Sequence, residues 1–209
     1  MHMRLSANAI VFVLVSASSA VASDKTAISN TEAIVRKSFS TATPDDWSAR
    51  LKQDDVQALC SHYRNNPPPK IAARILASQQ QALRYPAGGK MMGDWREGEK
   101  LASIGTGGQL SSIKPENSGT PKGGNCYACH ALAPSEVAAG NLGPSLTGFG
   151  RMRGTSPDAV KRTYAQIFNV QAFYPCSVMP RFGHNRWLTP EQIADAVAFL
   201  LDPESPVNK

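Results

Sequence analysis

The chain has 209 residues, 42% hydrophobic and 18% charged, a composition typical of a globular protein with one core and room for an extension. Its 22 Lys and Arg residues against 16 Asp and Glu give a formal net charge of +6. There is no dense basic run and no nucleic-acid-binding motif, which argues against binding to DNA or RNA. No apolar run is long enough for a membrane span.

The first 22 residues have the form of a secretory signal peptide. Arg4 precedes an apolar run over 9–15, and Ala20-Val21-Ala22 fits a cleavage site, which would make Ser23 the first mature residue. An uncleaved anchor is the alternative, but the apolar run is short for one. Because Arg4 is the only charged residue before Ser23, cleavage would change the net charge from +6 to +5. We therefore predict a periplasmic protein whose positive charge can steer acidic partners.

Residues 23–90 are predicted to form an N-terminal helical extension. Residues 23–42 are polar and small and predict a mobile start. Thr43-Pro44 then has the residues of a helix start, and this helix would carry Trp47 and, beyond a break, Cys60. The prolines of 65–69 interrupt it, and a second helix is expected from about residue 70 to residue 85.

Residues 91–209 are predicted to form a separate helical domain. A helix is expected over 94–102, followed by a long loop over 105–125 that is rich in Gly, Ser and Pro. Ser156-Pro157 begins a helix that runs to about residue 168. The last helix begins at Thr189, which forms a capping box with Gln192, and ends at Asp202. No convincing strand pattern is present, so the predicted fold class is all-α.

The strongest motif is Cys126-Tyr127-Ala128-Cys129-His130, predicted to open a short helix that ends near Gly140. Two thiols separated by two residues, with a histidine directly after, are typical of c-type haem attachment. Each thiol bonds one vinyl group of the porphyrin, and His130 supplies the proximal imidazole. Half a zinc site, a thioredoxin-like redox pair and a chance pair of structural cysteines are the alternatives. We predict one covalently bound haem c.

A haem iron with one histidine ligand has a sixth position to fill. Met179 is the best candidate, because it lies in a loop over 173–180 between two helices and well downstream of His130. It could instead be a core gap-filler, the usual use of methionine. His184 is the rival ligand. The other candidates considered are Met91, Met92, Met152 and His62.

Two cysteines remain once the haem motif has used its pair. In an oxidising compartment, Cys60 and Cys176 are expected to form a disulfide. This bond would tie the extension to the loop that carries Met179. Two buried free thiols are the alternative.

The order of these elements over residues 93–202 resembles a class I cytochrome c. Three segments, Gly124–His130, Cys176–Gly183 and Leu200–Asn208, are similar to the SoxX family, the monohaem subunits of the SoxAX cytochromes of bacterial sulfur oxidation. The resemblance implies a class I cytochrome c-like haem domain with an N-terminal helical extension. It also implies that the carbonyl of Pro144 accepts the second N–H of His130, which would fix the orientation of its ring.

The resemblance implies a role as well. SoxAX, an L-cysteine S-thiosulfotransferase, joins thiosulfate oxidatively to a cysteine of a SoxYZ-type carrier. The bond-making step is assigned to the SoxA-type haem subunit, so no catalytic residue is expected in this chain. The SoxX-type subunit forms a heterodimer with it and passes electrons to a soluble cytochrome c. Open alternatives are a stand-alone electron shuttle, a haem enzyme with an open sixth position, and a zinc-bound or disulfide-stapled interaction protein.

Overall fold

The computed structural model describes residues 30–40, 42–44, 47, 51–106 and 122–209 of the chain. The described part is helical and contains no strand, as predicted. The signal peptide predicted over 1–22 lies outside the described residues. The elements are α3 (Asp55–His62), α4 (Pro69–Gln81), α5 (Trp95–Ser103), η2 (Cys126–Ala128), α6 (Phe149–Arg153), α7 (Pro157–Phe168), η3 (Val170–Ala172), α8 (Pro190–Leu201) and η4 (Pro206–Asn208).

The last two α-helices, α7 and α8, begin where the sequence predicts. Ser156 caps α7 by accepting a hydrogen bond from the backbone N–H of Ala159. Thr189 and Gln192 form the predicted capping box at the start of α8. Proline occupies the first turn of both helices, where its missing N–H removes no intrahelical hydrogen bond.

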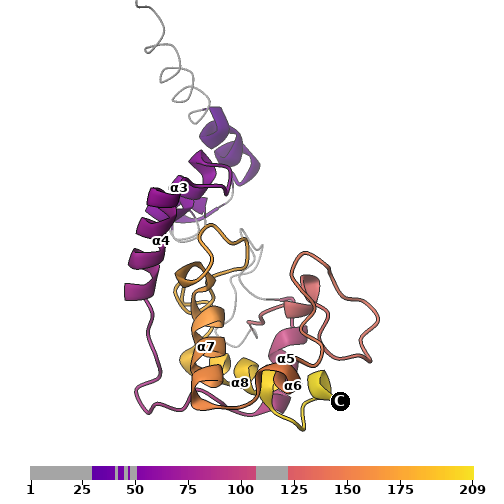
Figure 1. Ribbon diagram of the computed structural model, residues 1–209. Helices are drawn as coiled ribbons and strands as arrows, with labels where there is room; N and C mark the ends of the chain where they lie inside the picture. Colours follow the sequence, from indigo (N-terminus) through magenta and orange to yellow (C-terminus); the bar gives the residue numbers. More distant parts are fainter. Residues whose placement is uncertain (1–29, 41, 45–46, 48–50, 107–121) are drawn as a thin grey trace, which may run out of the picture.

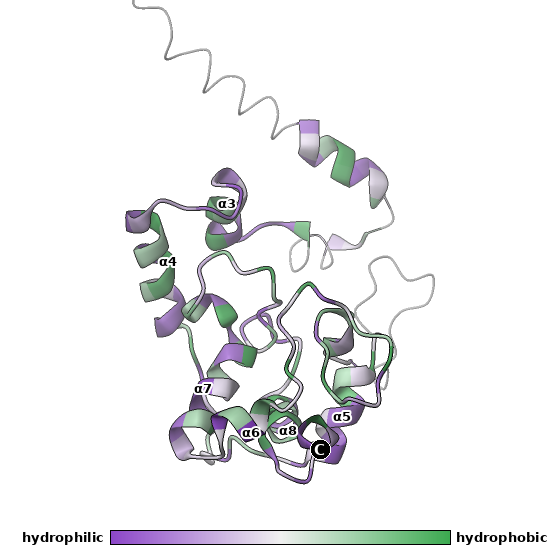
Figure 2. Ribbon diagram, turned by 45° about the vertical axis from the view of Figure 1, so that its right-hand side comes forward, coloured by the Kyte–Doolittle hydropathy of each residue, from purple (hydrophilic) through white to green (hydrophobic). Residues whose placement is uncertain are grey.

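The main core of the protein forms around α8, which packs most extensively against α5 and also contacts α6 and α7 (Figure 1). α8 is hydrophobic on most of its surface, and Ile193, Val197 and Leu201 are fully buried (Figure 2). α5 approaches α8 closely at Gly98, where a Cβ atom would lie 2.1 Å from the carbonyl oxygen of Asp195. Only glycine permits backbones to come this close.

The extension forms a second, smaller unit, with α3 and α4 lying on the far side of α7 from α5 (Figure 1). Its apolar cluster joins Cys60 and Ile75 to Cys176, a residue of the loop between η3 and α8. A disulfide bonds Cys60 to Cys176, with the two Cα atoms 5.3 Å apart. The extension is thus covalently connected to the C-terminal half. A domain boundary near residue 90 stays a prediction.

Two local predictions were wrong. Residues 30–38 are helical, although a mobile segment was expected there. The helix expected from Thr43 falls largely on residues that the structure does not describe; after the expected break, α3 begins at Asp55 with its own capping box, formed by Asp54 and Gln57. The haem motif opens a single 3-10 turn, η2, rather than a helix reaching Gly140.

The last of these differences has a local cause. The chain after η2 makes its hydrogen bonds back to the motif instead of along a helix. The N–H of Gly140 donates to the carbonyl of Tyr127, and the N–H of Gly143 donates to that of Cys129, both at 2.8 Å. These bonds fold the segment after the motif into a loop that lies against the motif itself.

Candidate functional site

The motif of two cysteines and one histidine is held by one backbone turn. The carbonyl of Cys126 accepts hydrogen bonds from the N–H groups of Cys129 and His130, at 3.1 and 2.9 Å. Asn125, with a φ of 45°, turns the chain into this arrangement. The turn brings the first cysteine and the histidine to one pocket, which both side chains line.

His130 has its ring fixed from two directions. Its Nδ1 lies 2.7 Å from the carbonyl oxygen of Pro144. A carbonyl can only accept, so Nδ1 carries a proton, and in the neutral imidazole Nε2 then keeps its lone pair. Gly143 lies flat against the ring, because a Cβ atom at this position would be 2.2 Å from Cε1 of His130. The resemblance to cytochromes implied the Pro144 contact, but nothing in the sequence indicated that Gly143 makes room for the imidazole.

The pocket is apolar on almost every side. It encloses about 460 Å³ of space that atoms do not fill, part of it open to solvent. The lining residues are Leu101, Ala102, Cys126, His130, Leu132, Leu146, Ile167, Met179, Phe182, Leu188, Ala196, Phe199 and Leu200. Among them, His130, Cys126 and Met179 alone carry a nitrogen or sulfur atom in the side chain.

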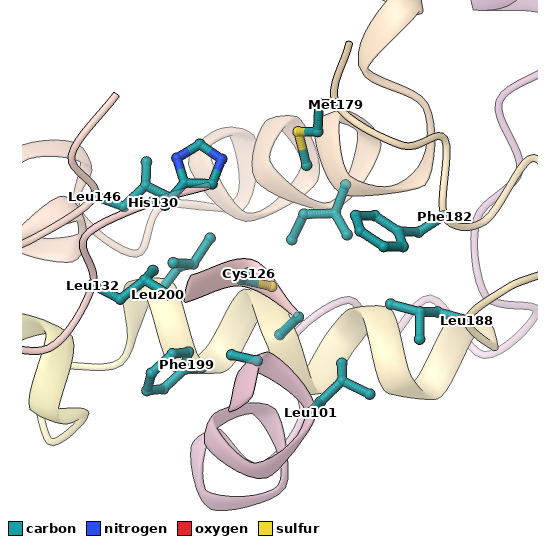
Figure 3. Close-up of a pocket in the computed structure, with 13 residues that line it drawn as sticks. Leu101, Cys126, His130, Leu132, Leu146, Met179, Phe182, Leu188, Phe199 and Leu200 are labelled. Carbon is teal, nitrogen blue, oxygen red and sulfur yellow. The ribbon is translucent and has the colours of Figure 1, made fainter. Parts of the chain in front are cut away.

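Met179 and His130 reach the pocket from two different loops. Figure 3 shows the thioether and the imidazole on the same side of the view, above the apolar side chains of α5 and α8. The rival His184 does not line the pocket. Its backbone N–H donates to the carbonyl of Phe168. Burial and the nearby Arg181 guanidinium lower the pKa of His184.

The remaining candidate ligands also lie away from the pocket lining. Met91 and Met92 pack against the main core, and Met152 is largely exposed. The ring of His62 contacts that of Tyr63 edge-on. Of two nearby aromatic residues, Phe182 lines the pocket, whereas Tyr127 packs against the core without being part of the lining.

The two motif thiols have different surroundings. Burial in the apolar pocket, together with the neighbouring Cys129, raises the pKa of the Cys126 thiol to about 11. Cys129 is half-buried and does not line the pocket. Neither thiol is in a disulfide. Within the described residues, no group of three or more His, Cys, Asp and Glu side chains could hold a metal ion, which gives no support to the zinc alternative.

These residues fit a haem. An apolar cavity suits a porphyrin, two free thiols suit covalent attachment, and an imidazole whose Nδ1 is already hydrogen-bonded offers Nε2 to iron. The donor set contains no carboxylate that would suit a hard metal ion instead.

Comparisons with known proteins agree with this chemistry. The profile of a family described as cytochrome c oxidase, cbb3-type, subunit III matches residues 122–200, the part that carries the motif, most of the pocket lining and nearly all of α8. Residues 122–200 therefore form a c-type cytochrome domain, which implies covalently bound haem and points to electron transfer. The chain is 43% identical over 162 residues to an uncharacterized lipoprotein of Aquifex aeolicus (strain VF5), an alignment that spans 77% of this chain and 75% of that protein. At this identity and coverage, the chain belongs to the same family as that lipoprotein.

None of the helices in the described residues is both long enough and apolar enough to traverse a bilayer.

Proposed function

We propose that this cytochrome holds a single haem c, with His130 and Met179 as its two axial ligands. One observation carries the proposal. The bond from Nδ1 of His130 to the Pro144 carbonyl leaves Nε2 as the free donor in a pocket that Met179 also lines. His184, the rival ligand, lies outside that lining.

A bound haem would supply one-electron exchange between ferric and ferrous iron. The residues of this chain would set how readily that exchange occurs. The neutral thioether of Met179 favours the ferrous state and raises the reduction potential. The leucine, isoleucine and phenylalanine walls offer water no hydrogen-bond partners in the site. With both axial positions filled and no acid or base in the pocket, the site suits electron transfer rather than chemistry on a bound substrate.

The finer proposal is that the chain is the SoxX-type subunit of a SoxAX complex. The similarity of the Met179 loop and of the C-terminal segment to that family supports it, and so does the extension, which a simple shuttle does not need. Joining thiosulfate to a carrier thiol forms one S–S bond and releases one proton and two electrons. A single haem accepts those electrons one at a time.

The proposed partners follow from this reaction. A SoxA-type haem subunit would form the heterodimer and perform the bond-making step on a SoxYZ-type carrier. A soluble cytochrome c would then take the electrons from this chain. We place the complex in the periplasm, reached through a signal peptide over 1–22. The printed description of the Aquifex aeolicus relative as a lipoprotein agrees with export from the cytoplasm.

Co-expression with a SoxA-type subunit tests the proposal. We expect the two chains to co-purify, and the haem of this chain to be reduced on addition of thiosulfate and carrier. Reduction should fail when the carrier cysteine is replaced by serine. A chain that never co-purifies, yet exchanges electrons rapidly with small redox proteins, would instead be the stand-alone shuttle. Strong binding of carbon monoxide by the ferrous protein would indicate an open sixth position.

A further inference from the structure

The loop that carries Met179 is tied to the extension on both sides of the methionine. Three residues before it, Cys176 is bonded to Cys60 of α3. Two residues after it, Arg181 makes hydrogen bonds to Asp54, which caps α3, and to Gln79 of α4. The methionine therefore sits between two long-range connections to the same part of the chain.

Arg181 is a buried cation whose position is set by its partners. Its side chain is only 4% exposed. One guanidinium nitrogen donates to the carboxylate of Asp54, and the other donates to Oε1 of Gln79 at 3.2 Å. A buried charge is costly unless it is paired and hydrogen-bonded, so these two acceptors restrict where Arg181 can lie.

The acceptors are themselves held in place. Gln79 is 5% exposed, and its Oε1 also accepts a hydrogen bond from Asn169, the residue that ends α7. The other carboxylate oxygen of Asp54 accepts the N–H of Gln57 at 2.8 Å, as part of the capping box of α3. Arg181 is thus connected to α3, α4 and the end of α7, all rigid elements.

The loop has little local structure of its own. Near the methionine, its hydrogen bonds are long: Met179 N–H to the Ser177 hydroxyl and the Gln171 amide to the Ser177 carbonyl, both at 3.3 Å, and Ser177 N–H to the Tyr174 carbonyl at 3.1 Å. Val178, next to the methionine, is 65% exposed. A functional side chain needs supporting residues that fix its position, and in this loop the long-range connections supply that support.

From this arrangement we infer that Arg181, with Asp54 and Gln79, positions Met179 as an iron ligand. The inference rests on the proposed ligation by Met179. It gives the extension a role at the redox site, in addition to any role in binding a partner.

Asp54→Asn in the full-length haem protein is the principal test. Asparagine caps helices as well as aspartate does, so the variant removes the charge at the Arg181 contact while retaining the cap of α3. The ferric protein should lose most of its far-red sulfur-to-iron charge-transfer band, and cyanide should bind about 10-fold to 100-fold more tightly, as for other residues that orient metal ligands. Asp55→Asn is the matched control, because Asp55 is the next residue, is exposed, and makes no contact with Arg181.

The reduction potential separates positioning from a simple effect of charge. Removing the Asp54 carboxylate leaves the Arg181 cation unbalanced, which alone would favour ferrous iron and raise the potential. Displacement of Met179 lowers it. We expect the potential to fall. The double variant Asp54→Asn, Gln79→Glu returns a carboxylate to Arg181 from α4 and should restore both the band and the potential.

Two further variants keep the outcomes distinct. If Asp54→Asn does not fold, Arg181→Lys remains informative, because lysine keeps the charge but cannot reach both acceptors with a planar fork. A full-strength band in Arg181→Lys, or in a folded Asp54→Asn protein, overturns the inference. Met179→Ala tests the ligand itself: if the band survives in that variant, the proposed ligation fails, independently of Arg181.

Discussion

The disulfide between Cys60 and Cys176 should contribute a large part of the stability of this cytochrome. The two cysteines are separated by 116 residues. In the chain-entropy relation, closing a loop of that size destabilises the unfolded state by about 5 kcal/mol at room temperature, and removal of native disulfides typically costs about 2–5 kcal/mol. We therefore expect the variant Cys60→Ala, Cys176→Ala to lose a free energy of unfolding in this range. Alanine is preferable to serine because both positions are buried, and an unpaired hydroxyl there would add a cost of its own.

Urea unfolding of the haem protein, followed by far-ultraviolet circular dichroism, measures the loss from the shift of the midpoint at constant slope. Wild-type protein unfolded in the presence of a thiol reductant is the control, since the haem already occupies both motif thiols and only the bond between Cys60 and Cys176 can be reduced. It should match the double variant. A loss below about 1 kcal/mol, with an unchanged slope, would show that the unfolded chain is not restrained as the loop length requires.

Three other predictions concern the site and its supports. Met179→Ala should abolish the far-red band of the ferric protein and lower its reduction potential; an unchanged absorption spectrum would contradict the ligand assignment. Gly143→Ala should force the His130 ring from its place, because the new Cβ atom would lie 2.2 Å from Cε1, whereas Gly88→Ala, with nothing within 4 Å, should be neutral; haem content per chain measures both. Burial alone would raise the pKa of Asp54. The hydrogen bond from the Gln57 backbone N–H and the Arg181 guanidinium outweigh burial, so the pKa of Asp54 is lowered. The ionised Asp54 carboxylate therefore stabilises the fold above the usual carboxyl pKa of about 4. This stabilisation is lost as the pH falls through the lower pKa that Asp54 has in the folded protein. The free energy of unfolding of Asp54→Asn, measured with urea, should be lower than that of the wild type at pH 7, and the two values should converge in acid.

Features specified by a few adjacent residues could be predicted from the sequence. The starts of α7 and α8 each need one capping side chain and one proline, and both occur at the expected positions. The haem motif is likewise local, because its chemistry requires two thiols and an imidazole within one turn.

Features that depend on distant partners could not be predicted in this way. The segment after the motif contains several alanines, which favour helix, but the N–H groups of Gly140 and Gly143 bond back to the motif turn. Arg181 lies 127 residues from Asp54 in the chain, and a lone arginine in a loop is usually solvent-exposed. Nothing local indicates that its charge is buried. The flat contact between Gly143 and His130 was missed for the same reason.

The disulfide also has a consequence for how the protein is made. It joins the first and the last of the four cysteines, and the two haem-binding cysteines lie between them in the sequence. Cys60 is synthesised first. It has to remain unpaired, or later exchange its partner, during the time in which Cys126 and Cys129 have been made and Cys176 has not. An oxidant that bonds cysteines in the order of their synthesis would give the wrong product, because four cysteines allow three complete pairings and this protein needs none of them. Maturation therefore calls for haem attachment before the final oxidation, or for a disulfide isomerase that corrects early pairs. In a host that lacks both, we expect the chain to accumulate with its haem-binding thiols oxidised.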